Sequence, residues 1–272
     1  MSRPVRIGVQ ITPGGMPDYR TWRQAILHAE ELGADVILGY DHFQVPKIEG
    51  IVDGKPVMAE IQPDAPNFEG WTALASWGEI TTRAEIGLLV TGIGYRNPDL
   101  LADMARTVDH ISGGRLILGV GAGWYENDYT SYGYDFGTVK SRMDLFDEGL
   151  LRIESRLAQL NPPPVRKIPV LIGGAGFKRT LPAVARHADI WHAFLPIELY
   201  REATARVAEL AVGFGRADSD IERSVTWKDE DSAEQFADAG ASLFLTDIHP
   251  TDAGYDFSTL ETVLKWRANR AR

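Results

Sequence analysis

The sequence contains no cysteine, which excludes disulfide bonds, thiolate metal sites, a cysteine nucleophile and iron–sulfur clusters with cysteine ligands. It has no apolar run near the roughly 18 residues that a membrane span requires, and its first residues lack the pattern of a signal peptide. It also lacks a basic surplus, because the formal net charge is −10, which argues against nucleic acid or an anionic membrane as a partner. We therefore expect a soluble, cytoplasmic protein.

Several familiar motifs are absent as well. Neither G-x-G-x-x-G nor G-x-x-x-x-G-K-[ST] occurs, so NAD-type and ATP-type pockets have little support. Without G-x-S-x-G, a serine hydrolase is also poorly supported. No spacing of His, Asp and Glu resembles a metal site, so we expect no metal.

What the chain does have is a regular alternation of short apolar runs and amphipathic segments along 272 residues, 44% of them hydrophobic. The expected strands are 5–11, 35–39, 85–91, 115–120, 168–172, 189–194, 221–227 and 241–246. The expected helices are 18–32, 70–82, 99–111, 138–160, 177–186, 198–212, 230–239 and 257–268. Eight strand–helix units predict an α/β fold, a single-domain (β/α)8 TIM barrel over residues 1–272, with an open doubly wound sheet as the alternative.

A longer irregular segment, about residues 44–69, follows the second expected strand. Within it, Asp53-Gly54 stands between apolar residues, which predicts a small hairpin. Loops of this length are uncommon unless they serve as lids or binding loops.

Polar and glycine-rich residues cluster where the expected strands end, which is where barrel enzymes place their active sites. Asp41-His42 follows the second strand and is the best acid–base candidate, because an imidazole titrates near neutrality; the alternative is an ordinary loop histidine. Residues 113–129 contain the fourth strand, then bare backbone, then aromatic and polar side chains. This pattern suits the close approach of a flat ligand, although a glycine-rich turn with a packed Trp has the same pattern.

A second glycine run, residues 173–176, leads into a helix whose first turn carries Lys178 and Arg179. Exposed N–H groups, the positive end of the helix and two cations suit a phosphate, and the alternative is a tight strand-to-helix turn. His192 is expected to be a core residue of the sixth strand, facing either the barrel or the helices. The histidines expected in helices are His28, His110 and His187, and we expect them to lie at the surface or to make hydrogen bonds within their helices.

In their order and spacing, these stretches resemble the bacterial-luciferase-like family of flavin and deazaflavin oxidoreductases. The matching stretches are 40–43, 89–91, 95–98, 112–116, 121–124, 129–133, 168–176 and 188–191. The resemblance covers about residues 5–195. It implies a (β/α)8 barrel whose mouth holds the deazaflavin coenzyme F420 or, alternatively, FMN.

The resemblance also implies site residues. Asp41 and His42 match a pair at the deazaflavin ring, and Leu89-Val90 matches a non-proline cis peptide behind it. Trp124 stands where sugar-phosphate dehydrogenases of the family carry an acidic glutamate, so the proton donor is open, and the nearby, unaligned Glu126 is a catalytic candidate. The residues expected along the cofactor are Asp41, His42, Leu89, Val90, Thr91, Gly121, Ala122, Gly123, Trp124 and Asn127, with Gly173, Gly174, Ala175 and Gly176 at its phosphate.

The expected function is hydride transfer between C5 of F420 and a small organic substrate. His42 would exchange the proton or hold the ring, and Asp41 would orient it. An aromatic mouth suggests a partly apolar substrate; the residues expected there are Phe43, Trp124, Tyr125 and either Trp191 or Trp227. The alternatives are an FMN-dependent monooxygenase that uses reduced flavin and oxygen, and a non-catalytic flavin-binding protein. The resemblance also implies a homodimer, because members of the family are commonly dimeric.

Overall fold

Eight parallel strands close into a barrel, as predicted, and the open doubly wound sheet is wrong. The structure is a computed structural model that describes residues 3–46, 48–52, 55–58 and 65–270. The first strand pairs on both sides, with the second and with the last, which closes the sheet. The barrel strands are β1 (Arg6–Ile11), β2 (Val36–Gly39), β5 (Glu85–Leu88) continued by β6 (Thr91–Gly92), β7 (Leu116–Gly121), β8 (Val170–Gly173), β9 (Ile190–His192), β10 (Glu222–Thr226) and β11 (Ala241–Ile248).

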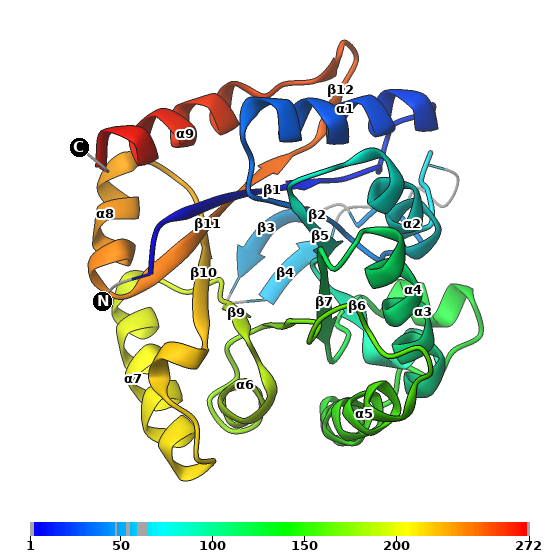
Figure 1. Cartoon of the computed structure of the whole chain (residues 1–272), viewed down its shortest axis with the longest axis vertical. Coiled ribbons are helices and arrows are strands. Elements are labelled where there is room, and N and C mark those ends of the chain that lie inside the picture. The colour runs from blue at the N-terminus through cyan, green and yellow to red at the C-terminus, as the bar shows by residue number, and fades with distance from the viewer. Residues whose placement is uncertain (1–2, 47, 53–54, 59–64, 271–272) are drawn as a thin grey trace.

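Helices surround the strands, as Figure 1 shows in a view along the barrel. The eight predicted helices are present, with ends that differ from the prediction by at most three residues. They are α1 (Tyr19–Leu32), α2 (Gly70–Ile80), α3 (Pro98–Ile111), α5 (Val139–Gln159), α6 (Thr180–His187), α7 (Ile197–Gly213), α8 (Glu230–Asp238) and α9 (Ser258–Arg270). In α1, for example, the Asp18 side chain caps the first turn and Gly33, at φ 111°, ends the helix.

The core of the fold consists of two apolar clusters. The larger cluster lies between the strands and the helices. The smaller cluster fills the barrel, and its members are Val36, Leu38, Ile117, Leu171, Ile190, Leu243 and Leu245. Leu89 and Val90 pack against this inner cluster, so the barrel is a filled core with its mouth above them.

The strand formed by β5 and β6 carries one extra residue. Gly87 pairs with Ile117 and Thr91 with Val120, so four steps on this strand match three on β7. The Leu89–Val90 peptide between them is cis, as the family resemblance implied.

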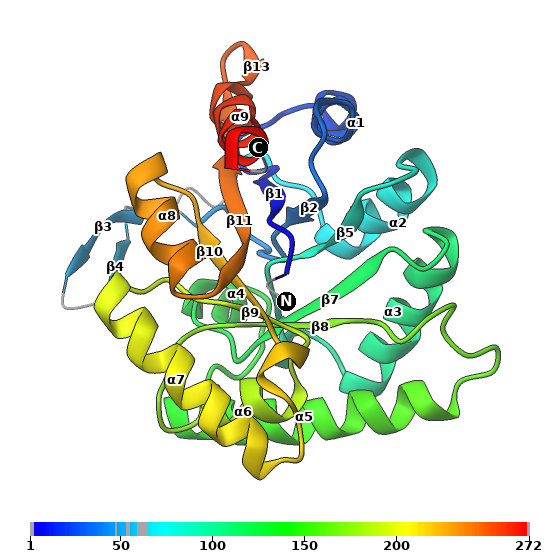
Figure 2. The ribbon, with the colours of Figure 1, turned by 60° about the vertical axis from the view of Figure 1, so that its left-hand side comes forward.

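The irregular segment after β2 contains the predicted hairpin, formed by β3 (Ile48–Val52) and β4 (Lys55–Met58). Its turn, residues 53–54, lies outside the described residues. Figures 1 and 2 place the hairpin at the end of the barrel where the strands finish. A second, two-stranded hairpin of β12 (Pro250–Thr251) and β13 (Gly254–Tyr255), which follows β11, was not predicted. Among the described residues, no helix is long and apolar enough to cross a membrane.

Candidate active site at the barrel mouth

His42 lies directly after β2, and a carboxylate 86 positions away in the chain holds its ring. Nδ1 of His42 is 2.6 Å from Oδ2 of Asp128. The other oxygen, Oδ1, accepts the backbone N–H groups of Phe43 and Gln44 at 3.0 Å each, and the Tyr95 hydroxyl donates to Oδ2 at 2.7 Å. The carboxylate is fully buried. Because an ionised carboxylate only accepts, Asp128 fixes the orientation of the imidazole and keeps its proton on Nδ1.

Asp128 belongs to α4 (Glu126–Ser131), a short helix that the sequence pattern did not predict. Tyr125, Asp128 and Tyr129 are three and four positions apart, so this local helix places them on one side, and all three are buried. The spacing was the available signal. It was missed because six residues give too few repeats to distinguish a helix from a loop.

Three aromatic rings surround the His42 imidazole edge-to-face. The ring centroids of Tyr40, Trp124 and Tyr125 lie 5.3, 5.5 and 5.5 Å from it. The His42 side chain is 15% exposed, and Trp124 is 44% exposed. Phe43 packs on Tyr95, with ring centroids 4.5 Å apart. We call the rings of Tyr40, Phe43, Trp124 and Tyr125 the aromatic wall of the mouth. A molecule at the mouth can therefore reach the imidazole along a mostly apolar surface.

Asp41 does not orient His42, so that expectation is wrong. Its carboxylate is bound by Arg96, whose Nη1 and Nη2 donate to Oδ2 and Oδ1 at 2.5 and 3.0 Å. Arg96 also donates to Glu69 at 2.7 Å. Burial raises the pKa of Asp41 to about 6, while the nearby Arg96 acts against that shift. Asp41 therefore ties the loop after β2 to the segment before α3.

Glycines at the ends of β7 and β8 leave space around Val90. A Cβ at Gly121 would lie 2.7 Å from Cγ2 of Val90, and one at Gly173 would lie 3.4 Å from Cγ1. At Gly123, φ is 82° and a Cβ would meet the Tyr129 hydroxyl at 2.0 Å, so only glycine fits. These residues form a floor, which we define as Val90, Gly121 and Gly173. An apolar floor edged by bare backbone fits the flat ring of a flavin or deazaflavin.

The second glycine run differs in part from its prediction. The helix after it begins at Thr180, because the Gly176 carbonyl accepts from the backbone N–H groups of Arg179 and Leu181 and extends the turn. Arg179 points to α5, where it donates to Asp144 and Asp147 at 2.9 and 2.6 Å. Arg179 as a phosphate ligand is therefore wrong.

What remains at this turn is backbone and one exposed cation. Gly174, at φ 117°, donates its N–H to the His192 carbonyl at 3.0 Å, and its own carbonyl accepts from Trp191 at 2.7 Å. Lys178 is exposed beside it. Phosphate binding by residues 173–176 stays a prediction.

The other predicted contacts differ in accessibility. Glu126 is exposed and Asn127 half-buried in the first turn of α4, and Ala122 is half-buried beside the floor. Thr91 is fully buried, and its hydroxyl accepts from Trp71 at 2.9 Å. Roles for these residues toward a cofactor stay predictions.

Two tryptophans offered as alternatives for the mouth face away from it. Trp191 stacks on Tyr200 of α7, and Trp227 packs on Trp266 of α9. Both belong to the cluster between the strands and the helices, so their place at the mouth is wrong. His192, in contrast, is fully buried, as predicted.

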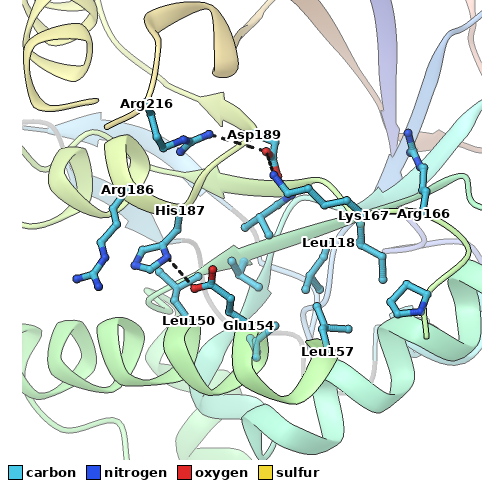
Figure 3. A pocket seen from close by; sticks show the side chains of 15 residues that line it. Leu118, Leu150, Glu154, Leu157, Arg166, Lys167, Arg186, His187, Asp189 and Arg216 are labelled. Atoms are coloured by element: carbon cyan, nitrogen blue, oxygen red, sulfur yellow. Dashed lines mark hydrogen bonds and ion pairs between the residues drawn. The ribbon is translucent and has the colours of Figure 1, made fainter. Parts of the chain in front are cut away.

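A cavity of about 570 Å³ lies elsewhere, outside the barrel, against β7, β8, α5 and α6. Figure 3 shows apolar side chains at the base of this cavity and charged side chains at its rim. At the rim, Lys167 and Arg216 lie 2.5 and 3.8 Å from Asp189, and His187 lies 3.7 Å from Glu154. None of the predicted site residues lines it. The mouth, where the strands end and His42 lies beside aromatic rings, is the better candidate active site.

Comparison with known proteins identifies the family of the chain. A family model described as luciferase-like monooxygenase matches residues 1–228. A Mycobacterium tuberculosis protein, named by inference a coenzyme F420-dependent oxidoreductase, is 31% identical over 228 residues, 72% of this chain and 56% of that protein. The Mycobacterium kansasii phthiodiolone/phenolphthiodiolone dimycocerosates ketoreductase is 28% identical over 251 residues, 80% of this chain and 66% of that enzyme. The alignments thus span only about three fifths of these relatives' length.

Solved structures share the fold at low identity. An F420-dependent secondary alcohol dehydrogenase in complex with an F420–acetone adduct has a TM-score of 0.78 at 16% identity, covering 97% of this chain and 99% of that one. The F420-dependent tetrahydromethanopterin reductase of Methanopyrus kandleri has a TM-score of 0.70 at 15% identity, covering 97% of each chain. A long-chain alkane monooxygenase has a TM-score of 0.65 at 14% identity, covering 88% and 69%. The family match over residues 1–228 shows that the chain belongs to the luciferase-like monooxygenase family, and the solved structures share its fold.

Proposed function

We propose that this chain is an F420-dependent oxidoreductase that transfers a hydride between C5 of the deazaflavin and the carbonyl or alcohol carbon of a partly apolar substrate. The names of an F420-dependent oxidoreductase and a ketoreductase among its relatives support the choice. So does the likeness to two F420-dependent enzymes along almost the whole chain. The observation that carries the proposal is His42, held by buried Asp128 beside the aromatic wall of the mouth.

The floor would lie under the cofactor ring, and the backbone of residues 174–176 would lie near its phosphate. Bound deazaflavin supplies or accepts the hydride. The protein contributes the geometry, an apolar wall that limits water around the reacting atoms, and the movement of the proton at the substrate oxygen.

His42 is the residue suited to move that proton. Because Asp128 holds the proton on Nδ1, the neutral ring presents the lone pair of Nε2. In the oxidation direction, Nε2 accepts the proton of an alcohol hydroxyl; in the reduction direction, the imidazolium returns it to a carbonyl oxygen. The negative charge of Asp128 stabilises the imidazolium in both directions.

Titration of the purified protein with F420 and with FMN, followed by fluorescence, tests the choice of cofactor. We expect tighter binding of F420, and hydride transfer to it from secondary alcohols, seen as a change in F420 absorbance. His42→Gln should retain cofactor binding and lose about 10²–10⁴-fold in kcat. His28→Gln, on the exposed side of α1, is the matched control and should match the parent protein. Tighter binding of FMN than of F420 would count against the proposal.

An FMN-dependent monooxygenase is the second candidate, favoured by the likeness to the long-chain alkane monooxygenase. Such an enzyme would consume oxygen when supplied with reduced FMN and an apolar substrate. Oxygen uptake above that of free reduced FMN would support it. Turnover with F420 and no such uptake would exclude it, and binding of both cofactors without any turnover would indicate a non-catalytic flavin-binding protein.

A further inference from the structure

One ring nitrogen of His192 is buried without a partner. The residue is fully buried, its Nδ1 is 2.9 Å from the Ser224 hydroxyl, and its Nε2 has no hydrogen-bond partner among the residues described. Leaving a buried polar atom unpaired costs free energy, so folded proteins keep few of them. A bound molecule that completes the hydrogen bond is one explanation for keeping such an atom.

His192 points into the barrel at its mouth. Ile190, two positions earlier on β9, packs in the cluster that fills the barrel, whereas Trp191 between them packs outward. Because side chains alternate along a strand, His192 faces inward at the last residue of β9. It pairs across the sheet with Gly173, the floor residue at which a Cβ would lie 3.4 Å from Cγ1 of Val90.

The two histidines stand on opposite sides of the mouth. Around the closed barrel, β9 is four strands from β2 through β1, β11 and β10, and four strands away through the other side. His42 follows β2 and His192 ends β9. A ring resting on the floor would therefore lie between the two imidazoles.

Their chemistry differs because their partners differ. Burial lowers the pKa of His192 to about 3, so this ring is neutral near pH 7. Ser224 can donate to Nδ1 or accept from it, so Nε2 is free to take either role. At His42, Asp128 only accepts and therefore fixes the tautomer.

We propose that Nε2 of His192 donates a hydrogen bond to a carbonyl group of the molecule bound in the mouth. The carbonyl belongs to the cofactor ring or to the substrate, and the experiment separates these sources. A neutral donor places no charge beside the apolar floor. This inference rests on the proposed function, because it takes the mouth as the place where cofactor and substrate bind.

Phe194 is an exposed aromatic neighbour of His192. Its ring packs edge-on against His192 at 4.5 Å and is 67% exposed. Because Nε2 is inaccessible in the structure, a ligand must displace a neighbouring group to reach it. Phe194 is an exposed neighbour in contact with the imidazole, so its movement would open the way.

Binding measurements on three variants test the proposal. His192→Leu removes the donor, His192→Gln retains one, and His187→Leu alters a histidine of the outer cavity as a control. Dissociation constants are measured for oxidised F420 and for FMN, each without and with cyclohexanone. We expect His192→Leu to weaken binding about tenfold, His192→Gln to stay within about threefold, and His187→Leu to have no effect. Loss with the cofactor alone assigns the ring carbonyl, and loss confined to the added ketone assigns the substrate carbonyl.

Two further readouts do not depend on turnover. Thermal unfolding without ligand should show the double variant His192→Leu/Ser224→Ala to be no less stable than the parent protein, because it removes the unpartnered nitrogen together with the hydroxyl that bonds the other ring nitrogen; a structural role predicts a lower Tm. The ¹⁵N signal of Nε2 should shift when F420 or FMN is added. Unchanged affinities in His192→Leu, an unchanged Nε2 signal, or no binding of either cofactor would overturn the inference. A His192-dependent affinity for FMN without turnover of F420 would instead contradict the proposed function alone.

Discussion

Replacing Asp128 with Asn reverses the hydrogen bonding of His42 with little change in shape. The amide oxygen can still accept from the backbone N–H groups of Phe43 and Gln44, as Oδ1 does now. The amide nitrogen then takes the place of Oδ2, which is 2.6 Å from Nδ1 of His42. Since that nitrogen donates, His42 must accept at Nδ1 and carry its proton on Nε2. The imidazole then presents a donor where the parent protein presents a lone pair.

The size of the effect follows from the contacts. A hydrogen bond to a charged group contributes about 1.5–3 kcal/mol and a neutral one about 0.5–1.5 kcal/mol, so neutralising the acceptor of the two backbone bonds costs about 2 kcal/mol of stability. The Tyr95 hydroxyl, which now donates to Oδ2, loses its acceptor, and this costs about 1–3 kcal/mol more. The loss in kcat should be much larger. General acid–base catalysis is worth about 10²–10⁴-fold, and it depends on the lone pair of Nε2.

Urea unfolding and F420-dependent hydride transfer, measured on the same preparation, separate the two effects. We expect Asp128→Asn to fold, to bind F420 within about threefold of the parent protein, and to lose about 10²–10⁴-fold in kcat. Asp99→Asn is the control, because Asp99 makes a half-exposed ion pair with Arg152, and the variant should have the stability and kcat of the parent protein. A folded Asp128→Asn protein with the parent kcat would refute the reasoning.

Three further changes test other parts of the structure. Arg96→Met leaves the Asp41 carboxylate buried without its cation, so urea unfolding should show a loss of about 3–5 kcal/mol at pH 8 and a smaller loss at pH 5, where Asp41 takes up a proton. The pKa of His192 is about 3 in the folded protein and about 6.5 in the unfolded chain. As the pH drops below about 6.5, the unfolded chain takes up the proton first, so the free energy of unfolding falls, by about 2 kcal/mol at pH 5. Urea unfolding of His192→Leu, measured beside the parent protein, should not show this loss. Gly119→Ala places a Cβ 1.8 Å from the Leu88 carbonyl oxygen and should cost about 3 kcal/mol of stability or prevent folding. Gly213→Ala is the control, because open space surrounds this residue at the end of α7, and it should stabilise the protein by up to about 1 kcal/mol in the same assay. Equal effects at the two glycines would show that the close approach of β5 and β7 is unimportant.

The barrel was predictable because its signals are local. Apolar runs of strand length alternate with amphipathic helices, and residues such as Asp18 and Gly33 mark where a helix begins and ends. The hairpin after β2 and the cis peptide at Leu89–Val90 were also predicted, the first from Asp53-Gly54 and the second from the family resemblance. The late start of α6 was not, because it depends on how the Gly176 carbonyl is shared between two N–H groups.

The sequence by itself determined the alternating units and the positions of the strand ends. It also determined where the floor glycines lie, because Gly121 and Gly173 each end a strand that is recognisable from its own apolar residues. The tertiary structure alone decided which charges meet. Asp128 reaches His42 from 86 positions away, Arg96 takes Asp41 from 55 positions away, and Arg179 turns to α5. Adjacent residues such as Asp41 and His42 can have different partners, because their side chains meet different elements brought together only when the barrel closes.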